Sequence, residues 1–98
     1  MPAYLITNVR FMNPEKAQEY GRQVAMTIEK YGGRYLARGG SVEAAEGDWQ
    51  LHYMVIVEFP SLEQAKRWYD SDEYRPLKSL RHENADSQIV FVEGLPPS

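Results

Sequence analysis

Five side chains of this sequence have the chemistry of a small-molecule site. They are two arginines and three aromatic residues: Arg38, Trp68, Tyr69, Tyr74 and Arg81. Guanidinium groups bind carboxylates through paired hydrogen bonds, and a tyrosine hydroxyl can donate to the same ligand. Aromatic rings supply flat apolar walls for a pocket. We therefore expect a ligand-binding cleft between helices and sheet for a small aromatic or carboxylate-bearing compound. The residue types alone do not separate an enzyme from a binding protein.

Each of these residues also has a purely structural explanation. Trp68 and Tyr69 lie on the apolar stripe of a predicted helix, where aromatic side chains usually join the core. Arg38 lies in a predicted strand, on the same face as Leu36, and Glu58 of the neighbouring strand is a candidate ion-pair partner. If these explanations hold, the protein is a non-catalytic dimeric structural or interaction module. A shared pocket favours the ligand site, and scattered contacts favour the module.

The sequence shows no motif for a metal or a cofactor. His52 and His82 are its only histidines, and they form no two-histidine helical motif. There is no cysteine, which excludes thiolate ligands and thiolate catalysis. Gly32-Gly33 and Gly39-Gly40 have the spacing of neither a P-loop nor a dinucleotide fingerprint. We therefore expect no metal and no cofactor.

The charge balance argues against two classes of partner. The formal net charge is −3, from 11 basic and 14 acidic side chains. A mildly acidic surface does not attract nucleic acid or anionic membranes through its overall field. Residues 1–8 have neither the basic region nor the apolar stretch of a signal peptide. With the lack of cysteine, this predicts a cytoplasmic location.

The elements that must position these side chains alternate between strands and helices. Apolar and β-branched runs indicate strands, and apolar spacings of three and four indicate helices. The predicted elements are strands over residues 3–11, 35–46, 52–59 and 88–93, two helices over residues 14–31 and 62–69, and a short extra helix over residues 71–81. This β-α-β-β-α-β order predicts an α+β, ferredoxin-like fold with a four-stranded antiparallel sheet and the helices on one face. We expect one domain over residues 1–94 and a tail over residues 95–98.

Local signals mark where the helices begin and end. Asn13 comes just before Pro14 and can accept the free amides of the first turn. Gly32-Gly33 ends that helix, because glycine adopts the left-handed conformation without strain. Ser61 and Gln64 form a capping-box pattern at the start of the second main helix.

Both faces of the predicted sheet are apolar. In the strand over residues 52–59, Val55 and Val57 point one way, and Met54 and Ile56 point the other way. Helices cover only one face in this fold, so a monomer would show alternating apolar and polar residues. A contiguous apolar patch is uncommon on a monomer. We therefore expect a homodimer that pairs through the open face of the sheet.

Several short motifs together resemble a known family. They are the segment from Tyr31 to Gly40, Glu58-Phe59-Pro60-Ser61, Trp68-Tyr69-Asp70-Ser71, Tyr74, Leu80-Arg81 and Val92-Glu93-Gly94. With them, nearly the whole chain resembles the bacterial domain of unknown function 1330, a branch of the dimeric α/β-barrel superfamily. The resemblance implies a ferredoxin-like fold whose sheets pack face to face across a two-fold axis. It implies no particular activity, although related barrels include small monooxygenases that work without a cofactor.

Overall fold

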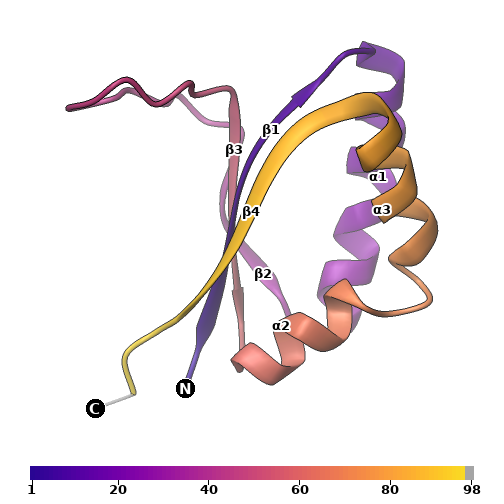
Figure 1. The fold of residues 1–98 in the computed structure, drawn as a ribbon. Helices are drawn as coiled ribbons and strands as arrows, with labels where there is room; N and C mark the ends of the chain where they lie inside the picture. Colours follow the sequence, from indigo (N-terminus) through magenta and orange to yellow (C-terminus); the bar gives the residue numbers. More distant parts are fainter. Residues whose placement is uncertain (97–98) are drawn as a thin grey trace.

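The computed structural model describes residues 1–96 as four strands and three helices. In chain order they are β1 (Ala3–Phe11), α1 (Pro14–Lys30), β2 (Arg34–Arg38), β3 (Tyr53–Phe59), α2 (Leu62–Tyr69), α3 (Arg75–Asn84) and β4 (Ala85–Glu93) (Figure 1). The strands form one antiparallel sheet in the order β2-β3-β1-β4. All three helices lie on the same side of it (Figure 1). The predicted ferredoxin-like fold and its extra helix before the last strand are confirmed.

The first two helices begin where local sequence signals placed them. The Asn13 side chain accepts a hydrogen bond of 2.9 Å from the Glu15 amide, and Pro14 is the first residue of α1. The Ser61 hydroxyl accepts one of 3.0 Å from the Gln64 amide at the start of α2. Each cap satisfies a backbone donor that has no partner inside its helix, which fixes the helix start.

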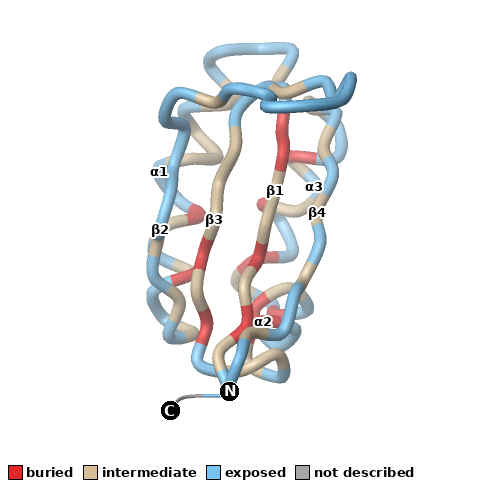
Figure 2. Tube along the Cα trace, turned by 90° about the vertical axis from the view of Figure 1, so that its left-hand side faces the viewer, coloured by how far each residue is buried: buried red, intermediate tan, exposed pale blue. Residues whose placement is uncertain are grey.

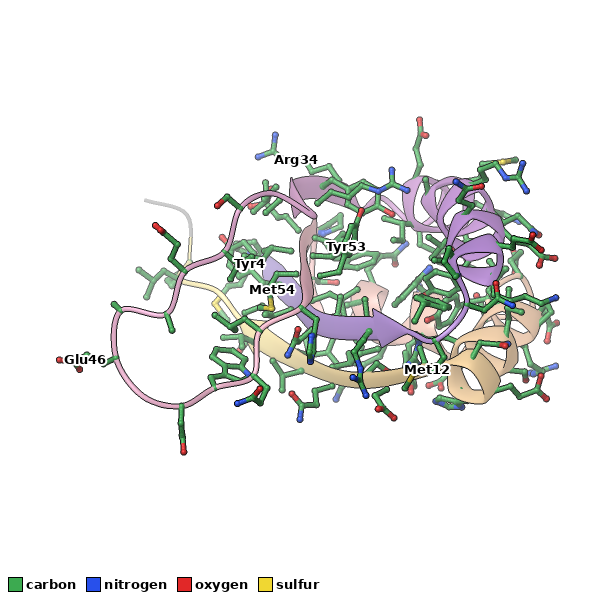
Figure 3. The ribbon with its side chains drawn as sticks, turned by 90° about the horizontal axis from the view of Figure 1, so that it is seen from above. Tyr4, Met12, Arg34, Glu46, Tyr53 and Met54 are labelled. Atoms are coloured by element: carbon green, nitrogen blue, oxygen red, sulfur yellow. The ribbon has the colours of Figure 1, made fainter. Side chains whose placement is uncertain are left out.

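Two predicted strand boundaries are wrong. β2 ends at Arg38 instead of residue 46, because Gly39 takes a positive φ of 70° and its missing side chain leaves room for the Tyr53 ring. Residues 39–52 instead form a loop that extends away from the helices, with Glu46 at its far end (Figures 1 and 3). β4 begins at Ala85 instead of residue 88, because α3 continues directly into it.

The core fills one end of the space between the sheet and the helices. Its largest fully buried side chains are Trp68, Tyr74, Phe59, Leu5 and Val57. The rings of Trp68 and Tyr74 pack against each other with their centroids 4.2 Å apart and their planes tilted by 32°. The indole N–H of Trp68 donates to the Thr27 hydroxyl at 2.9 Å, so α1 and α2 are joined by a satisfied polar contact inside the core.

Within residues 1–96 no helix lies over the other face of the sheet (Figure 2). Ile6 pairs with Ile56 on one side and with Val90 on the other, which places these three side chains on the same face. Val90 and Val92 remain about half exposed. The predicted two-sided apolar pattern is therefore present in the folded sheet. Within the predicted tail, residues 95–96 have no regular structure, and residues 97–98 lie outside the described residues.

Candidate functional site

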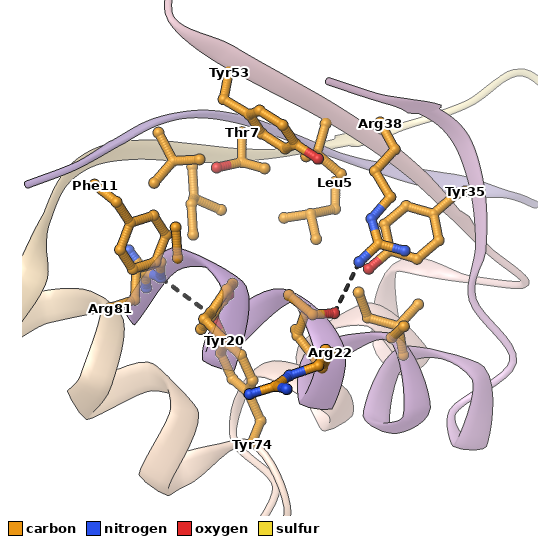
Figure 4. A pocket seen from close by; sticks show the side chains of 18 of the residues that line it. Leu5, Thr7, Phe11, Tyr20, Arg22, Tyr35, Arg38, Tyr53, Tyr74 and Arg81 are labelled. Atoms are coloured by element: carbon orange, nitrogen blue, oxygen red, sulfur yellow. Dashed lines mark hydrogen bonds between the residues drawn. The ribbon is translucent and has the colours of Figure 1, made fainter. Parts of the chain in front are cut away.

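A cavity of about 730 Å³ lies between α1 and the helix-facing side of the sheet (Figure 4). Its walls are mostly apolar and come from β1, α1, β3 and β4, with Leu5, Val9, Val24, Val55 and Ile89 among them. The volume is in the range that proteins use to bury small organic molecules. Several lining residues, among them Leu5, Val24 and Trp68, also belong to the buried core.

The charged side chains that line this cavity are all arginines. They are Arg22, Arg38 and Arg81, and the lining contains no aspartate or glutamate. Among residues 1–96, none of the three forms an ion pair with a carboxylate, whereas the remaining arginines all do: Arg10 with Asp86, Arg34 with Glu58, Arg67 with Glu63, and Arg75 with Asp72. The cavity is therefore positively charged in a protein whose net charge is −3.

Arg38 reaches the cavity because β2 contains an irregularity. The register shifts between Tyr35 and Ala37, so Arg38 pairs with Val55 on the helix-facing side. The expected shared face with Leu36 is therefore wrong. The Arg38 guanidinium lies 4.5 Å from the centre of the Tyr35 ring and donates to the Gly21 carbonyl at 2.8 Å.

The expected ion pair between Arg38 and Glu58 is also wrong. Glu58 lies on the open face of the sheet, directly across from Arg34, and accepts a hydrogen bond of 2.8 Å from the Arg34 Nε. Arg38 belongs to β2, as Arg34 does, but lies on the other face of the sheet. No acidic side chain within residues 1–96 accepts a hydrogen bond from its guanidinium group. The guanidinium is therefore available to a ligand at the cavity mouth.

The opposite end of the cavity contains a hydrogen-bonded chain of three side chains (Figure 4). The hydroxyl oxygens of Tyr20 and Tyr74 are 2.7 Å apart, and Arg81 Nε donates to the Tyr74 hydroxyl at 3.2 Å. Tyr74 and Arg81 lie two helical turns apart near α3, which brings both to the same side. Burial raises the pKa of the Tyr20 hydroxyl well above its ordinary value, so Tyr20 stays protonated.

Arg81 is a buried cation that has no carboxylate among its partners within residues 1–96. Its exposed fraction is 4%, and within the described chain its hydrogen-bond partners are Tyr74, Ser87 and His82. A buried charge is costly unless an opposite charge or several hydrogen bonds compensate it. The hydrogen bonds supply part of that compensation, and Arg81 also lines the cavity, where an anion could supply the rest.

The structure brings together four of the five residues singled out from the sequence. Arg38, Trp68, Tyr74 and Arg81 all line the cavity, with Trp68 also part of the core. Tyr69 does not line it. Its ring packs edge-on against Phe91, with centroids 5.8 Å apart, and the Lys78 ammonium lies 3.7 Å from its centre. For Tyr69 the structural explanation therefore holds.

Sequence reasoning missed four arginine or tyrosine residues of the lining. They are Tyr20, Arg22, Tyr35 and Tyr53. Tyr20 lies on α1 among apolar residues spaced three and four apart, yet a buried tyrosine hydroxyl needs a hydrogen-bond partner. The need for such a partner is the one signal in the sequence that could have pointed to Tyr20. It could not identify the partner, Tyr74, which is 54 positions away.

The two histidines lie elsewhere. His52 and His82 line a second, more polar pocket of about 410 Å³ together with Asn8 and Asp86. Within residues 1–96 no three histidine, aspartate or glutamate side chains are grouped as metal ligands would be. In the same residues no helix has the length and apolar character that crossing a membrane requires.

Comparison with solved structures shows the same fold in proteins of low sequence identity. Protein RPA0582 of Rhodopseudomonas palustris, a protein of unknown function, is 24% identical with a TM-score of 0.74, over 98% of this chain and 84% of that one. SnoaB, a cofactor-independent oxygenase from Streptomyces nogalater, is 9% identical with a TM-score of 0.70, over 98% and 95%. A protein of unknown function and possible oxidoreductase from Bacteroides thetaiotaomicron is 13% identical with a TM-score of 0.62, over 95% and 97%. At these identities the likeness shows the fold alone.

Sequence comparison identifies the family. No curated protein matches the chain. The profile of the domain of unknown function DUF1330 matches residues 2–95, which is nearly the whole length. The resemblance carried by the Tyr31–Gly40 segment and the other short motifs is therefore confirmed, and this chain belongs to the DUF1330 family.

Proposed function

We propose that this protein binds a small aromatic compound with a carboxylate or similar anionic group in the cavity between α1 and the sheet. The observation that carries the proposal is the charge of the lining. Arg81 is buried without a carboxylate partner, and Arg22 and Arg38 at the same cavity also have none among residues 1–96. An anionic ligand compensates this charge and satisfies the free guanidinium donors.

The remaining walls favour an aromatic ligand. Apart from the arginines, the lining is dominated by aliphatic side chains and the rings of Phe11, Tyr20, Tyr35 and Tyr53. Flat rings of this kind stack on or edge against a ligand ring, and such pairs are worth about 0.5–1.5 kcal/mol beyond the buried area. A short aliphatic acid would satisfy the arginines but leave these walls uncovered.

Conversion of the ligand is a further step of the same proposal. The chain shares its fold with SnoaB, which is a cofactor-independent oxygenase, but 9% identity gives no correspondence of residues. The absence of a cofactor and the cytoplasmic location remain predictions from the sequence. Binding is therefore the part of the proposal that the cavity itself supports.

A thermal-shift screen with matched ligand pairs tests the proposal. Each aromatic carboxylic acid is compared with its own carboxamide, which has nearly the same shape and no charge. We expect acids to raise the melting temperature and the amides to leave it nearly unchanged, because only the carboxylate pairs with the guanidinium groups. Equal shifts for acids and amides, or no shift for any aromatic acid in a broad set, would contradict the proposed function.

The open face of the sheet supports a second proposal, a homodimer. Its central side chains Tyr4, Ile6, Met54 and Ile56 are apolar, and Val90 and Val92 extend the patch while about half exposed. The loop of residues 39–52 reaches out on this same side, away from the helices, and exposes 57% of Trp49 (Figures 1 and 3). A second copy placed on the sheet would cover the patch and the loop together. In this arrangement each subunit keeps its own cavity, and without a ligand the protein is the dimeric module described above.

A further inference from the structure

The chain from Arg81 through Tyr74 to Tyr20 has a direction that hydrogen-bond chemistry fixes in part. A guanidinium group can donate but not accept, so the Tyr74 hydroxyl oxygen accepts from Arg81 Nε over 3.2 Å. The hydroxyl oxygens of Tyr74 and Tyr20 are 2.7 Å apart, and geometry alone allows either to donate.

Burial determines which tyrosine donates. Tyr74 has an exposed fraction of 0%, and within the described residues its hydroxyl contacts only Arg81 and Tyr20. If Tyr20 donated to Tyr74, the Tyr74 proton would be buried without an acceptor, which carries the full desolvation penalty of that donor. Tyr74 therefore donates to Tyr20, and the proton of Tyr20, a residue that lines the cavity, is left for a group inside the cavity.

The Tyr20 hydroxyl is a stronger donor than an isolated tyrosine. Each hydrogen bond in the chain polarises the next, and the first donor is a full positive charge. Burial raises the pKa of the Tyr20 hydroxyl, so the proton stays on Tyr20 at neutral pH and is shared with an acceptor instead of being released. Through Tyr74, the positive charge of Arg81 polarises the O–H group that Tyr20 presents at the cavity wall.

The cavity has a second donor at its other end. The Arg38 guanidinium lies beside Tyr35, across the apolar walls from Tyr20 and Arg81 (Figure 4). Resting on the proposed function, we propose that Tyr20 is a specificity-determining residue that donates to a hydroxyl or enolate oxygen of a ligand whose carboxylate pairs with Arg38. The ligand class is then a hydroxylated aromatic carboxylate, with Tyr74 and Arg81 as positioning residues behind Tyr20.

Two fluorescent acids that differ by one hydroxyl test this inference. The probes are 6-hydroxy-2-naphthoate and 2-naphthoate, titrated into wild-type protein and into Tyr20→Phe. We expect the wild type to bind the hydroxylated acid about 3- to 10-fold more tightly, which is the usual worth of one hydrogen bond. Tyr20→Phe should bind both acids with the affinity that the wild type has for 2-naphthoate.

Tyr31→Phe is the matched control. Tyr31 follows α1, and its hydroxyl donates to Glu73 outside the cavity, so its loss should leave the preference intact. Equal binding of the two acids by the wild type would overturn the role of Tyr20 while leaving the proposed function standing. Failure of both acids to bind would overturn the proposed function and this inference with it.

The proposed positioning roles of Tyr74 and Arg81 need a measurement that would not change if these residues only stabilised the fold. The bound hydroxynaphthoate reports the ionisation of its own hydroxyl through its absorption spectrum. We expect this hydroxyl to titrate at lower pH in the wild-type complex than in water, because the donor chain favours the anionic form. In Tyr74→Phe, which separates Tyr20 from Arg81, the titration should move back toward the value in water. An unchanged titration in Tyr74→Phe, or in Tyr20→Phe if the first variant does not fold, would contradict the chain.

Discussion

The two faces of the sheet differ in whether their charged side chains form ion pairs. On the open face the charged side chains pair with each other across neighbouring strands, Arg34 with Glu58 and Arg10 with Asp86. On the helix-facing side Arg38 points into a cavity where no carboxylate within the described residues meets it. The charges of these pairs on the open face are therefore compensated, as our proposed dimer requires, whereas the cavity has uncompensated positive charge, as our proposed ligand site requires. The predictions below test each half of this comparison.

The largest expected effect comes from placing a charge in the centre of the open face. Ile56→Lys puts an ammonium group beside Ile6 and Tyr4 on the central strands. Burying a large apolar side chain is worth about 1.5–3 kcal/mol, and the two-fold axis applies the change twice. We expect the wild type to be a dimer at micromolar concentration and Ile56→Lys to be a folded monomer, as measured by light scattering.

Met26→Lys is the control for this change. Met26 lies on α1 and is 72% exposed, so the same substitution there should keep the wild-type mass. A wild-type mass of one subunit would remove the dimer from the account, and the open face would then need another explanation.

The next largest effect distinguishes two arginines of the same strand. Arg38→Gln removes the charge at the cavity, and a hydrogen bond to a charged group is worth about 1.5–3 kcal/mol, or roughly 10- to 100-fold in affinity. Calorimetric titration with 2-naphthoate should show this loss. Arg34→Gln breaks only an exposed pair worth about 0–1 kcal/mol of stability and should leave binding unchanged. Equal losses in both variants would show that the cavity is not the binding site.

Alkaline pH should weaken the cavity side through its tyrosines. Burial raises the pKa of Tyr20 and of Tyr35, so both stay protonated when folded at a pH where the unfolded chain releases their protons. Their contribution to stability is complete below about pH 10 and falls above it, by about 1.4 kcal/mol per pH unit for the more deeply buried Tyr20 and by less for Tyr35. Urea unfolding between pH 9 and 11 should show a shallower decline in Tyr20→Phe. An identical decline in both proteins would mean that Tyr20 is not shielded from water.

The smallest effect concerns the loop that accompanies the open face. Trp68 is 1% exposed and Trp49 is 57% exposed in the single chain. If a second copy covers the loop, dissociation by Ile56→Lys should shift the tryptophan emission slightly to the red. The shift should vanish when Trp49→Phe is added, because Trp68 stays in the core. A shift that survives without Trp49 would place the change in the core instead of the loop.

Local sequence signals correctly predicted features that depend only on residues adjacent in the chain, such as the helix starts. Asn13 and Ser61 cap their helices as expected, because a cap involves only a few adjacent residues. The succession of strands and helices along the chain followed from the apolar patterns. The extent of β2 did not, because its end at Gly39 depends on the Tyr53 ring of another strand, which lies where a side chain would be.

The site was harder to predict, because its geometry is set by contacts between distant segments. The face of Arg38 depends on the register shift between Tyr35 and Ala37, and no residue type in that segment signals it. The contact of Tyr20 with Tyr74 joins α1 to the start of α3. Arg38, Tyr74 and Arg81 were found as chemically suitable residues, but their arrangement could only come from the structure.

The location of a bound aromatic anion tests the central claim most directly. Crystals grown with 6-bromo-2-naphthoate would show the bromine by its anomalous scattering and the carboxylate by its density. We predict one molecule per subunit between α1 and the sheet, with its carboxylate within hydrogen-bond distance of the Arg38 or Arg22 guanidinium and its rings against Leu5 and Val55. A bromine peak on the open face of the sheet, or on the outer surface of the helices with the cavity empty, would contradict the account.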